Sequence, residues 1–205
     1  MFAKGSLGWI ATPLALALVT ALFSFWFKSL SGAAVSIALF TTAGFIATFF
    51  RDPRRGIGAD VVSPADGHIA SVDVDGNRLS ILLSLFNVHV VRTPIAGEVR
   101  AMARRGRSHV PAYKNDSAGN ERLDVNISSK FGEFTVTLIT GFLARRIVPF
   151  VVRGDKLSKG ERIGIVRFGS RVDVQLPSGC QMIVLEGMKV RAGETSIAEV
   201  VDDSA

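Results

Sequence analysis

Two long stretches without charge constrain this chain most strongly. Residues 5–27 and 29–50 contain no Asp, Glu, Lys or Arg, and only Lys28 separates them. At 1.5 Å per helical residue, each stretch is long enough to cross a hydrocarbon core of about 30 Å. The pattern predicts an antiparallel α-hairpin over residues 1–50, which either spans a membrane or is embedded in one leaflet.

The charges that flank these stretches predict their orientation. Arg51, Arg54 and Arg55 follow the second stretch, whereas Lys28 stands alone on the opposite side. The positive-inside rule therefore places both termini and the rest of the chain in the cytoplasm. A cleaved signal peptide has a single, shorter apolar stretch, so it fits these two consecutive segments poorly.

Residues 51–205 have the pattern of a β-dominated domain. Short apolar runs such as "HIASVDV" and "EFTVTLIT" alternate with Gly, Asn and Pro at a spacing of about ten residues, which is typical of strands joined by turns. "KLSKGERIGIV" (156–166) and "MKVRAGETSIAEV" (188–200) are similar to each other. We expect them to form two related hairpins, like those of biotinyl and lipoyl carrier folds.

Composition narrows the functional classes. The net charge of +6 arises from scattered basic residues, and the only tyrosine is Tyr113, so a nucleic-acid partner is not expected. Attraction to anionic lipid is a simpler use of this charge. Cys180 is the only cysteine, which excludes an internal disulfide and a Cys-based zinc site. We expect no metal, and we expect Cys180 to be a small core residue.

Three residues offer reactive groups. Ser170 follows Gly169 in "RFGSRVDVQLP", where strand patterns stand on both sides; His89 lies in "FNVHVVRTPIAG" and Asp66 in "VSPADG". Taken singly they fit a strand bend, a core histidine and a turn. Together they are the parts of an activated hydroxyl. The G-x-S-x-G elbow is absent around Ser170, so ordinary serine hydrolysis is not favoured.

An ordered series of motifs carries a family resemblance. It comprises two apolar segments ending in "FRDP" (50–53), then "VSPADG" (62–67), "FNVHVVRTPIAG" (86–97), "NER" (120–122), "ARRIV" (144–148), "RFGSRVDVQLP" (167–177) and "VRAGETSIAEV" (190–200). In this order the motifs resemble the short bacterial form of phosphatidylserine decarboxylase, over nearly the whole chain. The resemblance implies a proenzyme of the inner membrane, with its catalytic domain on the cytoplasmic side.

The resemblance also implies a mechanism for the Gly-Ser pair. Ser170 attacks the carbonyl of Gly169, the chain is cleaved between them into 1–169 (β chain) and 170–205 (α chain), and Ser170 becomes a pyruvoyl group. That covalent cofactor forms a Schiff base with phosphatidylserine and releases phosphatidylethanolamine. His89 is the expected base, and Asp66 is expected to fix its tautomer and orientation.

Other roles and functions are less constrained. The resemblance implies that Arg122, Arg145, Arg146 and Thr140 contact substrate, although Thr140 stands in "LITG", where a more polar run is commoner. The two cleaved chains are expected to stay associated, and homo-oligomerisation is left open. A first alternative is a membrane-tethered biotinyl or lipoyl carrier modified at Lys189 in "EGMKV". A second is a membrane adaptor without enzymatic activity.

Overall fold

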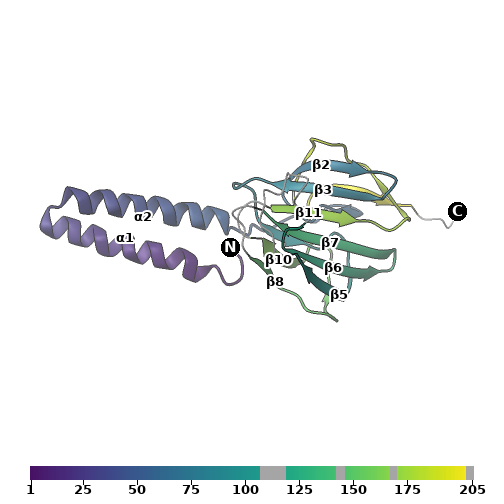
Figure 1. The fold of residues 1–205 in the computed structure, drawn as a ribbon, viewed down its shortest axis with the longest axis horizontal. Coiled ribbons are helices and arrows are strands. Elements are labelled where there is room, and N and C mark those ends of the chain that lie inside the picture. Colours follow the sequence, from purple (N-terminus) through teal and green to yellow (C-terminus); the bar gives the residue numbers. More distant parts are fainter. Residues whose placement is uncertain (107–118, 142–145, 167–169, 202–205) are drawn as a thin grey trace. The chain divides into compact units, whose positions relative to one another are not determined.

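The computed structural model of the chain describes residues 1–106, 119–141, 146–166 and 170–201, with the main chain alone at Ser170. The chain forms two compact units, Met1–Pro53 and Arg54–Ala205. Helices make up the first unit and strands dominate the second (Figure 1). The expected fold class, an α-hairpin followed by a β-dominated domain, is confirmed.

The first unit is a tight helical hairpin. Helix α1 (Leu7–Phe27) and helix α2 (Leu30–Phe49) run side by side in Figure 1. Lys28 ends α1 in the left-handed conformation, with φ 50°. Ser29 caps α2, because its hydroxyl accepts a hydrogen bond from the main-chain N–H of Gly32 at 3.2 Å. The turn between the helices is therefore only Lys28 and Ser29.

Small and hydroxyl residues join the two helices. The hydroxyl of Ser36 donates to the main-chain oxygen of Ala17 at 2.9 Å, and both residues are buried. Large apolar side chains point outward instead; Phe25 is 85% exposed. This arrangement suits lipid, where close helix contacts use small residues and polar groups must be satisfied internally. Both helices are long and apolar enough to cross a membrane, with mean hydropathies of 1.9 and 1.8.

The second unit is built from short strands. They are β1 (Val61–Val62), β2 (Gly67–Asp73), β3 (Arg78–Leu83), β4 (Val90–Arg92), β5 (Gly97–Arg105), β6 (Arg122–Ser129), β7 (Gly132–Thr140), β8 (Ile147–Pro149), β9 (Lys156–Leu157), β10 (Arg162–Val166), β11 (Ser170–Gln175), β12 (Cys180–Met182), β13 (Lys189–Val190) and β14 (Ser196–Val200). One eight-stranded sheet has the order β13-β2-β3-β11-β7-β6-β5-β9. Two three-stranded sheets, β1-β14-β12 and β4-β10-β8, complete the unit.

The strand order reveals an internal duplication. In the large sheet, β13-β2-β3-β11 form one half and β7-β6-β5-β9 form the other, and the two halves meet where β11 pairs with β7. Residues 61–67 ("VVSPADG") lead from β1 into β2, and residues 90–97 ("VVRTPIAG") lead from β4 into β5. The two similar stretches at 156–166 and 188–200 form β9–β10 and β13–β14, which pair with the corresponding strands of each half. The two stretches are thus structurally related, within a larger repeat than the sequence analysis identified, but they are not hairpins, because the two strands of each stretch belong to different sheets.

One apolar core lies between the large sheet and the two small ones. It contains Val125, Leu138 and Val172 from the large sheet together with Ile163 of β10 and Ile197 of β14. Cys180 belongs to the same core, as expected, and its burial raises the pKa of the thiol. Successive strand residues point to opposite faces, so the polar positions of β6, β7 and β11 lie on the outer face of the large sheet.

The strand pattern on the two sides of the Gly-Ser pair belongs to two different sheets. Strand β10 ends at Val166 in a small sheet, and β11 begins at Ser170 in the large sheet. The change of sheet therefore falls between Val166 and Ser170, where the sequence alone indicated a bend within one strand. Gly169 itself lies outside the described residues.

Candidate active site

Ser170 occupies the first position of β11, between two other strands. Its main chain is in register with Leu83, the last residue of β3, and with Thr140, the last residue of β7. Both neighbours are buried, at 6% and 0% exposure. One end of the large sheet therefore gathers the start of β11 and the ends of β3 and β7. We call it the Ser170 end.

His89 is fully buried beside the strand that leads toward Ser170. It directly precedes β4, and its main-chain oxygen accepts a hydrogen bond from the N–H of Val166 at 3.3 Å. Four chain steps separate Val166 from Ser170, so their Cα atoms are at most roughly 14 Å apart. The topology thus brings His89 and the Gly169–Ser170 bond into one region.

The ring of His89 is oriented by a main-chain carbonyl. Nδ1 of His89 lies 2.8 Å from the main-chain oxygen of Asn87. Because a carbonyl oxygen only accepts, Nδ1 carries the hydrogen of this bond. In the neutral ring, Nε2 then carries the lone pair and is the atom able to take up a proton.

Asp66 is held in a different network from the one we expected. Its two carboxylate oxygens accept from Nη2 of Arg55 at 3.1 and 2.8 Å, and Oδ1 also accepts from the main-chain N–H of Ala192 at 2.8 Å. The side chains of Arg55 and Asp66 are only 8% and 10% exposed. The carbonyl of Asn87, rather than this carboxylate, makes the described contact with Nδ1 of His89.

The Arg55–Asp66 pair gives a prediction about stability. Asp66→Ala leaves the buried guanidinium of Arg55 with Glu194 alone, at 3.3 Å. We expect this loss to cost about 3 kcal/mol and to lower the Tm by roughly 10 °C. Thermal unfolding followed by circular dichroism in detergent measures the shift, with the exposed Asp75→Asn as control. Arg55→Met should act similarly, and the double variant should lose less than the sum. Additive losses would show that the pair does not act as a unit.

The "NER" motif fixes the end of β7. The side-chain amide of Asn120 donates to the main-chain oxygen of Thr140 at 2.7 Å, and the hydroxyl of Thr140 lies 3.1 Å from the main-chain oxygen of Glu121. Arg104 adds two further bonds, to Oε1 of Glu121 at 2.7 Å and to the main-chain oxygen of Ile147 at 3.0 Å. This network holds the strand end that lies in register with Ser170.

Arg122 lies on the outer face of the large sheet. With other polar residues it lines a hollow of about 410 Å³: Arg78, Arg105, Gly106, Asp124, Thr135, Thr137, Asp173 and Gln175. Arg105 is paired with Asp124 at 2.6 Å across this hollow. The structure thus separates Arg122 from the core side of the sheet, where Leu83 and Thr140 are buried.

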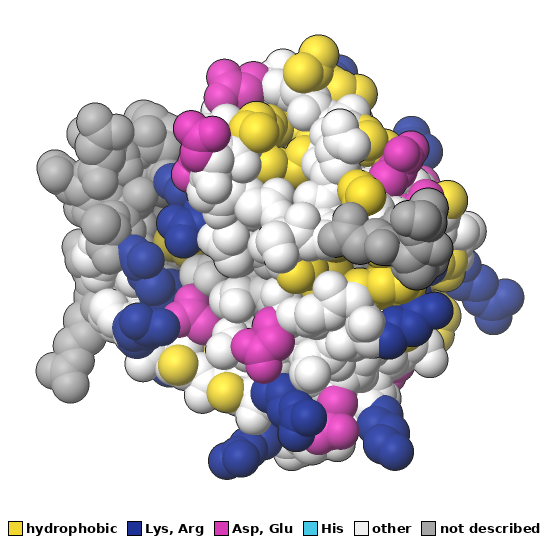
Figure 2. Space-filling view, turned by 90° about the vertical axis from the view of Figure 1, so that its right-hand side faces the viewer, with side chains coloured by type: hydrophobic (Ala, Val, Ile, Leu, Met, Phe, Trp, Pro, Cys, Tyr) yellow, Lys and Arg dark blue, Asp and Glu magenta, His cyan; other side chains and the backbone are white. Residues whose placement is uncertain are grey.

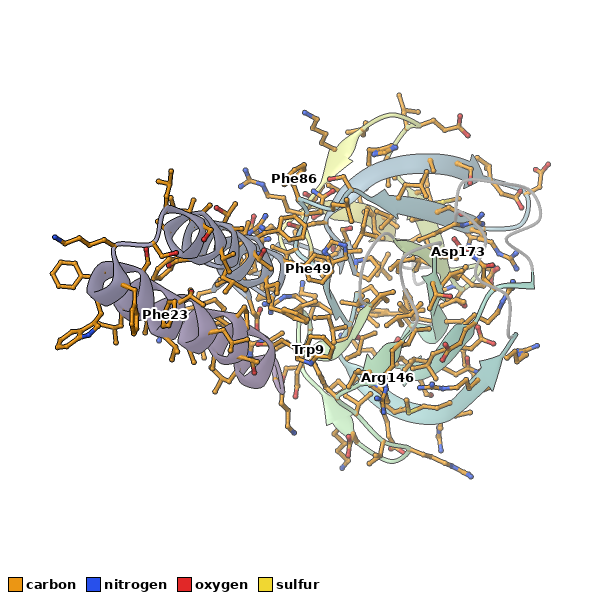
Figure 3. All side chains as sticks on the ribbon, turned by 60° about the vertical axis from the view of Figure 1, so that its left-hand side comes forward. Trp9, Phe23, Phe49, Phe86, Arg146 and Asp173 are labelled. Carbon is orange, nitrogen blue, oxygen red and sulfur yellow. The ribbon has the colours of Figure 1, made fainter. Side chains whose placement is uncertain are left out.

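The structure also places Arg146 and Lys189. Arg146 is exposed and directly precedes β8, on a part of the β domain separate from Asp173 (Figure 3). Arg145 lies outside the described residues, as does His109. Lys189 is exposed within β13 and pairs with His68, so it is not at the tip of the Glu186–Gly187 turn, where a carrier lysine would be expected.

The surface in Figure 2 carries basic and acidic side chains interspersed. Apolar side chains form a band among them. Among the described residues, no group of three or more His, Cys, Asp or Glu is arranged to hold a metal ion.

Sequence reasoning missed three residues of this region. Arg55 was counted only as a membrane-flanking charge, Asn87 was not singled out, and Asn120 was overlooked beside Arg122. Asn87 and Asn120 lie within motifs that were recognised, whereas Arg55 follows the FRDP motif by two residues. The sequence shows these polar residues, but their partners lie on distant segments or on the main chain.

Comparisons with known proteins agree with these motifs. The family model described as phosphatidylserine decarboxylase matches residues 42–198. A phosphatidylserine decarboxylase proenzyme of Thermobifida fusca is 44% identical over 202 residues, covering 95% of this chain and 91% of the relative. One of Streptomyces coelicolor is 40% identical over 199 residues, covering 95% and 90%. A candidate archaetidylserine decarboxylase proenzyme of Methanosarcina acetivorans is 40% identical over 214 residues, covering 99% of both chains.

Proposed function

This chain belongs to the phosphatidylserine decarboxylase family, and from that premise we propose that it converts phosphatidylserine to phosphatidylethanolamine and CO2 with a pyruvoyl group made from Ser170. The position of Ser170 carries the proposal. It opens β11 directly after the link, residues 167–169, between two sheets. Cleavage at this point removes no strand from either sheet.

We propose that the chain cleaves itself in steps that conserve every atom. The Oγ atom of Ser170 attacks the carbonyl carbon of Gly169, and the peptide C–N bond breaks to give an ester and a free amine. Elimination then removes the Cα proton of residue 170, forms the Cα–Cβ double bond, breaks the Cβ–Oγ bond and releases the carboxylate of Gly169. Water hydrolyses the resulting dehydroalanine to a pyruvoyl group and ammonia.

His89 is the proposed base for the first step. A serine hydroxyl is a weak nucleophile until a neighbouring group removes its proton. The bond between Nδ1 of His89 and the oxygen of Asn87 keeps the lone pair on Nε2, which is the arrangement that a base needs. Burial of the ring keeps competing water away from this nitrogen.

We propose that Asp66 holds neighbouring segments of the domain together and does not orient the imidazole ring of His89. It binds Arg55 on one side and the main chain of Ala192 on the other. Cleavage would leave Asp66 in the β chain and Ala192 in the α chain, so this bond would join the two products. Strand β11 between β3 and β7, and β14 beside β1, would add further contacts. We therefore propose that the two cleaved chains remain one folded domain.

The residues around Ser170 fit a pyruvoyl group. The buried register neighbours Leu83 and Thr140 provide a setting with little water at this sheet end. When present, the pyruvoyl carbonyl supplies an electron sink for the loss of CO2 from the seryl headgroup. Exposed Arg146 is a candidate for holding the phosphate or carboxylate of that headgroup, as is Arg145. Thr140 is better suited to fixing β7, and Arg122 faces the outer hollow.

Denaturing electrophoresis with intact-mass analysis tests this function. We expect two polypeptides, residues 1–169 and 170–205, the second beginning with a pyruvoyl group, and conversion of phosphatidylserine to phosphatidylethanolamine. A carrier would give one chain that binds streptavidin through Lys189. A single unmodified chain without decarboxylase activity would favour the adaptor.

We propose that the α-hairpin anchors the enzyme in the inner membrane with its β domain in the cytoplasm. The side chain of Arg55 is engaged by Asp66, yet Lys4, Arg51 and Arg54 still outnumber Lys28 on the opposite side. The anchor would hold the Ser170 end among its lipid substrates at high effective concentration.

Removing the anchor should therefore affect lipid substrates selectively. We expect deletion of residues 1–50 to lower decarboxylation of bilayer phosphatidylserine by about 10²-fold or more, because the effective concentration is lost. Activity on a short-chain, monomeric phosphatidylserine should change little. Parallel assays on vesicles and on the soluble lipid measure the ratio. An equal loss on both would mean that the hairpin supports folding instead.

The names of the relatives differ in the lipid that they give. Their names include both phosphatidylserine and archaetidylserine decarboxylases, at similar identity to this chain. Both names denote seryl lipids, so we propose the seryl headgroup as the recognised part. A competition assay with the two lipids in mixed vesicles measures the preference between them.

A further inference from the structure

Phe86 lies at the tip of a hydrogen-bonded turn that ends two residues before His89. The turn runs from Ser84 to Asn87, and Oδ1 of Asn87 accepts from the main-chain N–H of Ser84 at 2.8 Å and from its hydroxyl at 2.7 Å. The main-chain N–H of Asn87 donates back to the oxygen of Ser84 at 3.0 Å. Phe86 is nevertheless 70% exposed. The turn therefore presents an aromatic side chain on the surface of the β domain.

This turn belongs to the Ser170 end of the large sheet. It continues from β3, whose last residue, Leu83, is the register partner of Ser170. Its residue Asn87 also supplies the carbonyl that orients His89. Phe86 therefore lies on the surface next to the proposed reaction centre. In Figure 3 it lies at one end of the β domain, whereas Asp173 lies further along the sheet.

The chain itself holds this end close to the membrane. Helix α2 ends at Phe49, and Arg55 follows six residues later, so the two are at most roughly 20 Å apart. Arg55 is bound to Asp66, which directly precedes β2. In the pairing of β2 with β3, His68 is opposite Leu82, so Asp66 lies at the same end as the Phe86 turn. A membrane-embedded α2 thus keeps this end within reach of the bilayer.

From these observations we infer that Phe86 inserts into the acyl-chain region of the bilayer and docks the Ser170 end onto the lipid surface that holds the substrate. The inference rests on the proposed function for its substrate, and it names the contact by which the β domain reaches that substrate. Transfer of a phenyl ring from water to hydrocarbon favours the docked state by about tenfold or more.

Val74 is a matched control for this inference. It is 74% exposed, and it lies in the turn after β2, at the opposite end of the same pair of strands. With about 3.3 Å per strand residue, the length of β2 separates the two ends by roughly 20 Å. Docking by Phe86 therefore leaves Val74 in water.

The first test uses full-length protein reconstituted in phosphatidylcholine vesicles that contain phosphatidylserine. Phe86→Ser should lower decarboxylation in the vesicles by about tenfold. It should leave self-cleavage and turnover of a monomeric short-chain phosphatidylserine unchanged. Phe86→Trp should retain vesicle activity, and Val74→Ser should have no effect. Unchanged vesicle activity in Phe86→Ser, or an equal loss on both substrates, would overturn the inference.

The second test needs no catalysis, so it separates this inference from the proposed function. A cysteine at position 86 or 74, in a Cys180→Ser background, carries an environment-sensitive fluorophore. A quencher attached to the lipid acyl chains should reduce emission several-fold more at position 86 than at 74. Equal quenching at the two positions would overturn the docking. Energy transfer between two labelled copies, without quenching by lipid, would also overturn it. If wild-type protein fails to cleave but position 86 is quenched, only the proposed function fails.

Discussion

Ser170→Ala is expected to leave a single polypeptide of 205 residues with no decarboxylase activity. The substitution removes Oγ, which is the nucleophile of the cleavage and also the atom whose elimination from Cβ creates the dehydroalanine that becomes the pyruvoyl group. No other residue can replace it, because the cleaved bond must be the one that precedes the attacking side chain. Denaturing electrophoresis and a phosphatidylethanolamine assay measure the two losses together.

Two neighbouring variants serve as controls for this result. Ser170→Thr and Ser170→Cys keep a nucleophile on Cβ, so we expect slow cleavage from each rather than none. Arg171→Ala changes the next residue, whose guanidinium is paired with Asp173, and should cleave normally. Recovery of two chains from Ser170→Ala would show that another bond or another residue is used.

Composition and periodicity predicted the architecture well. The hairpin followed from charge-free segments of membrane length, and the β domain followed from short apolar runs between turn residues. Periodicity could not reveal the change of sheet at residues 167–169, because β10 and β11 have strand patterns whichever sheet they join. The duplication was only half visible, since the similarity of residues 61–67 to 90–97 is interrupted by one extra residue.

The candidate site was predicted less completely, for two physical reasons. The orientation of His89 depends on a main-chain carbonyl, which every residue possesses and no motif marks. The partner of Asp66 depends on how an irregular segment bearing Arg55 packs, which is a tertiary property. Arg122 is different, because alternation in "RLDVNI" places it on the same face as Asp124, opposite the buried Leu123 and Val125. That signal was present in the sequence.

His89→Ala should give the second largest effect, by slowing self-cleavage about 10²–10⁴-fold. The reason is the loss of a buried ring whose Nδ1 bond leaves a lone pair on Nε2, in the same region as Ser170. Accumulation of the 205-residue precursor in a time course after synthesis measures the rate.

A second substitution separates the base from the packing of the ring. His89→Asn offers a side-chain amide N–H to the oxygen of Asn87 but has no nitrogen that accepts a proton at neutral pH. If the ring matters as a base, His89→Asn should be as slow as His89→Ala. If it matters only because it anchors the turn, His89→Asn should recover much of the rate. His68→Ala, on an exposed strand position, should process normally. Cleavage of His89→Ala at the wild-type rate would remove His89 from the mechanism and require a different base for Ser170.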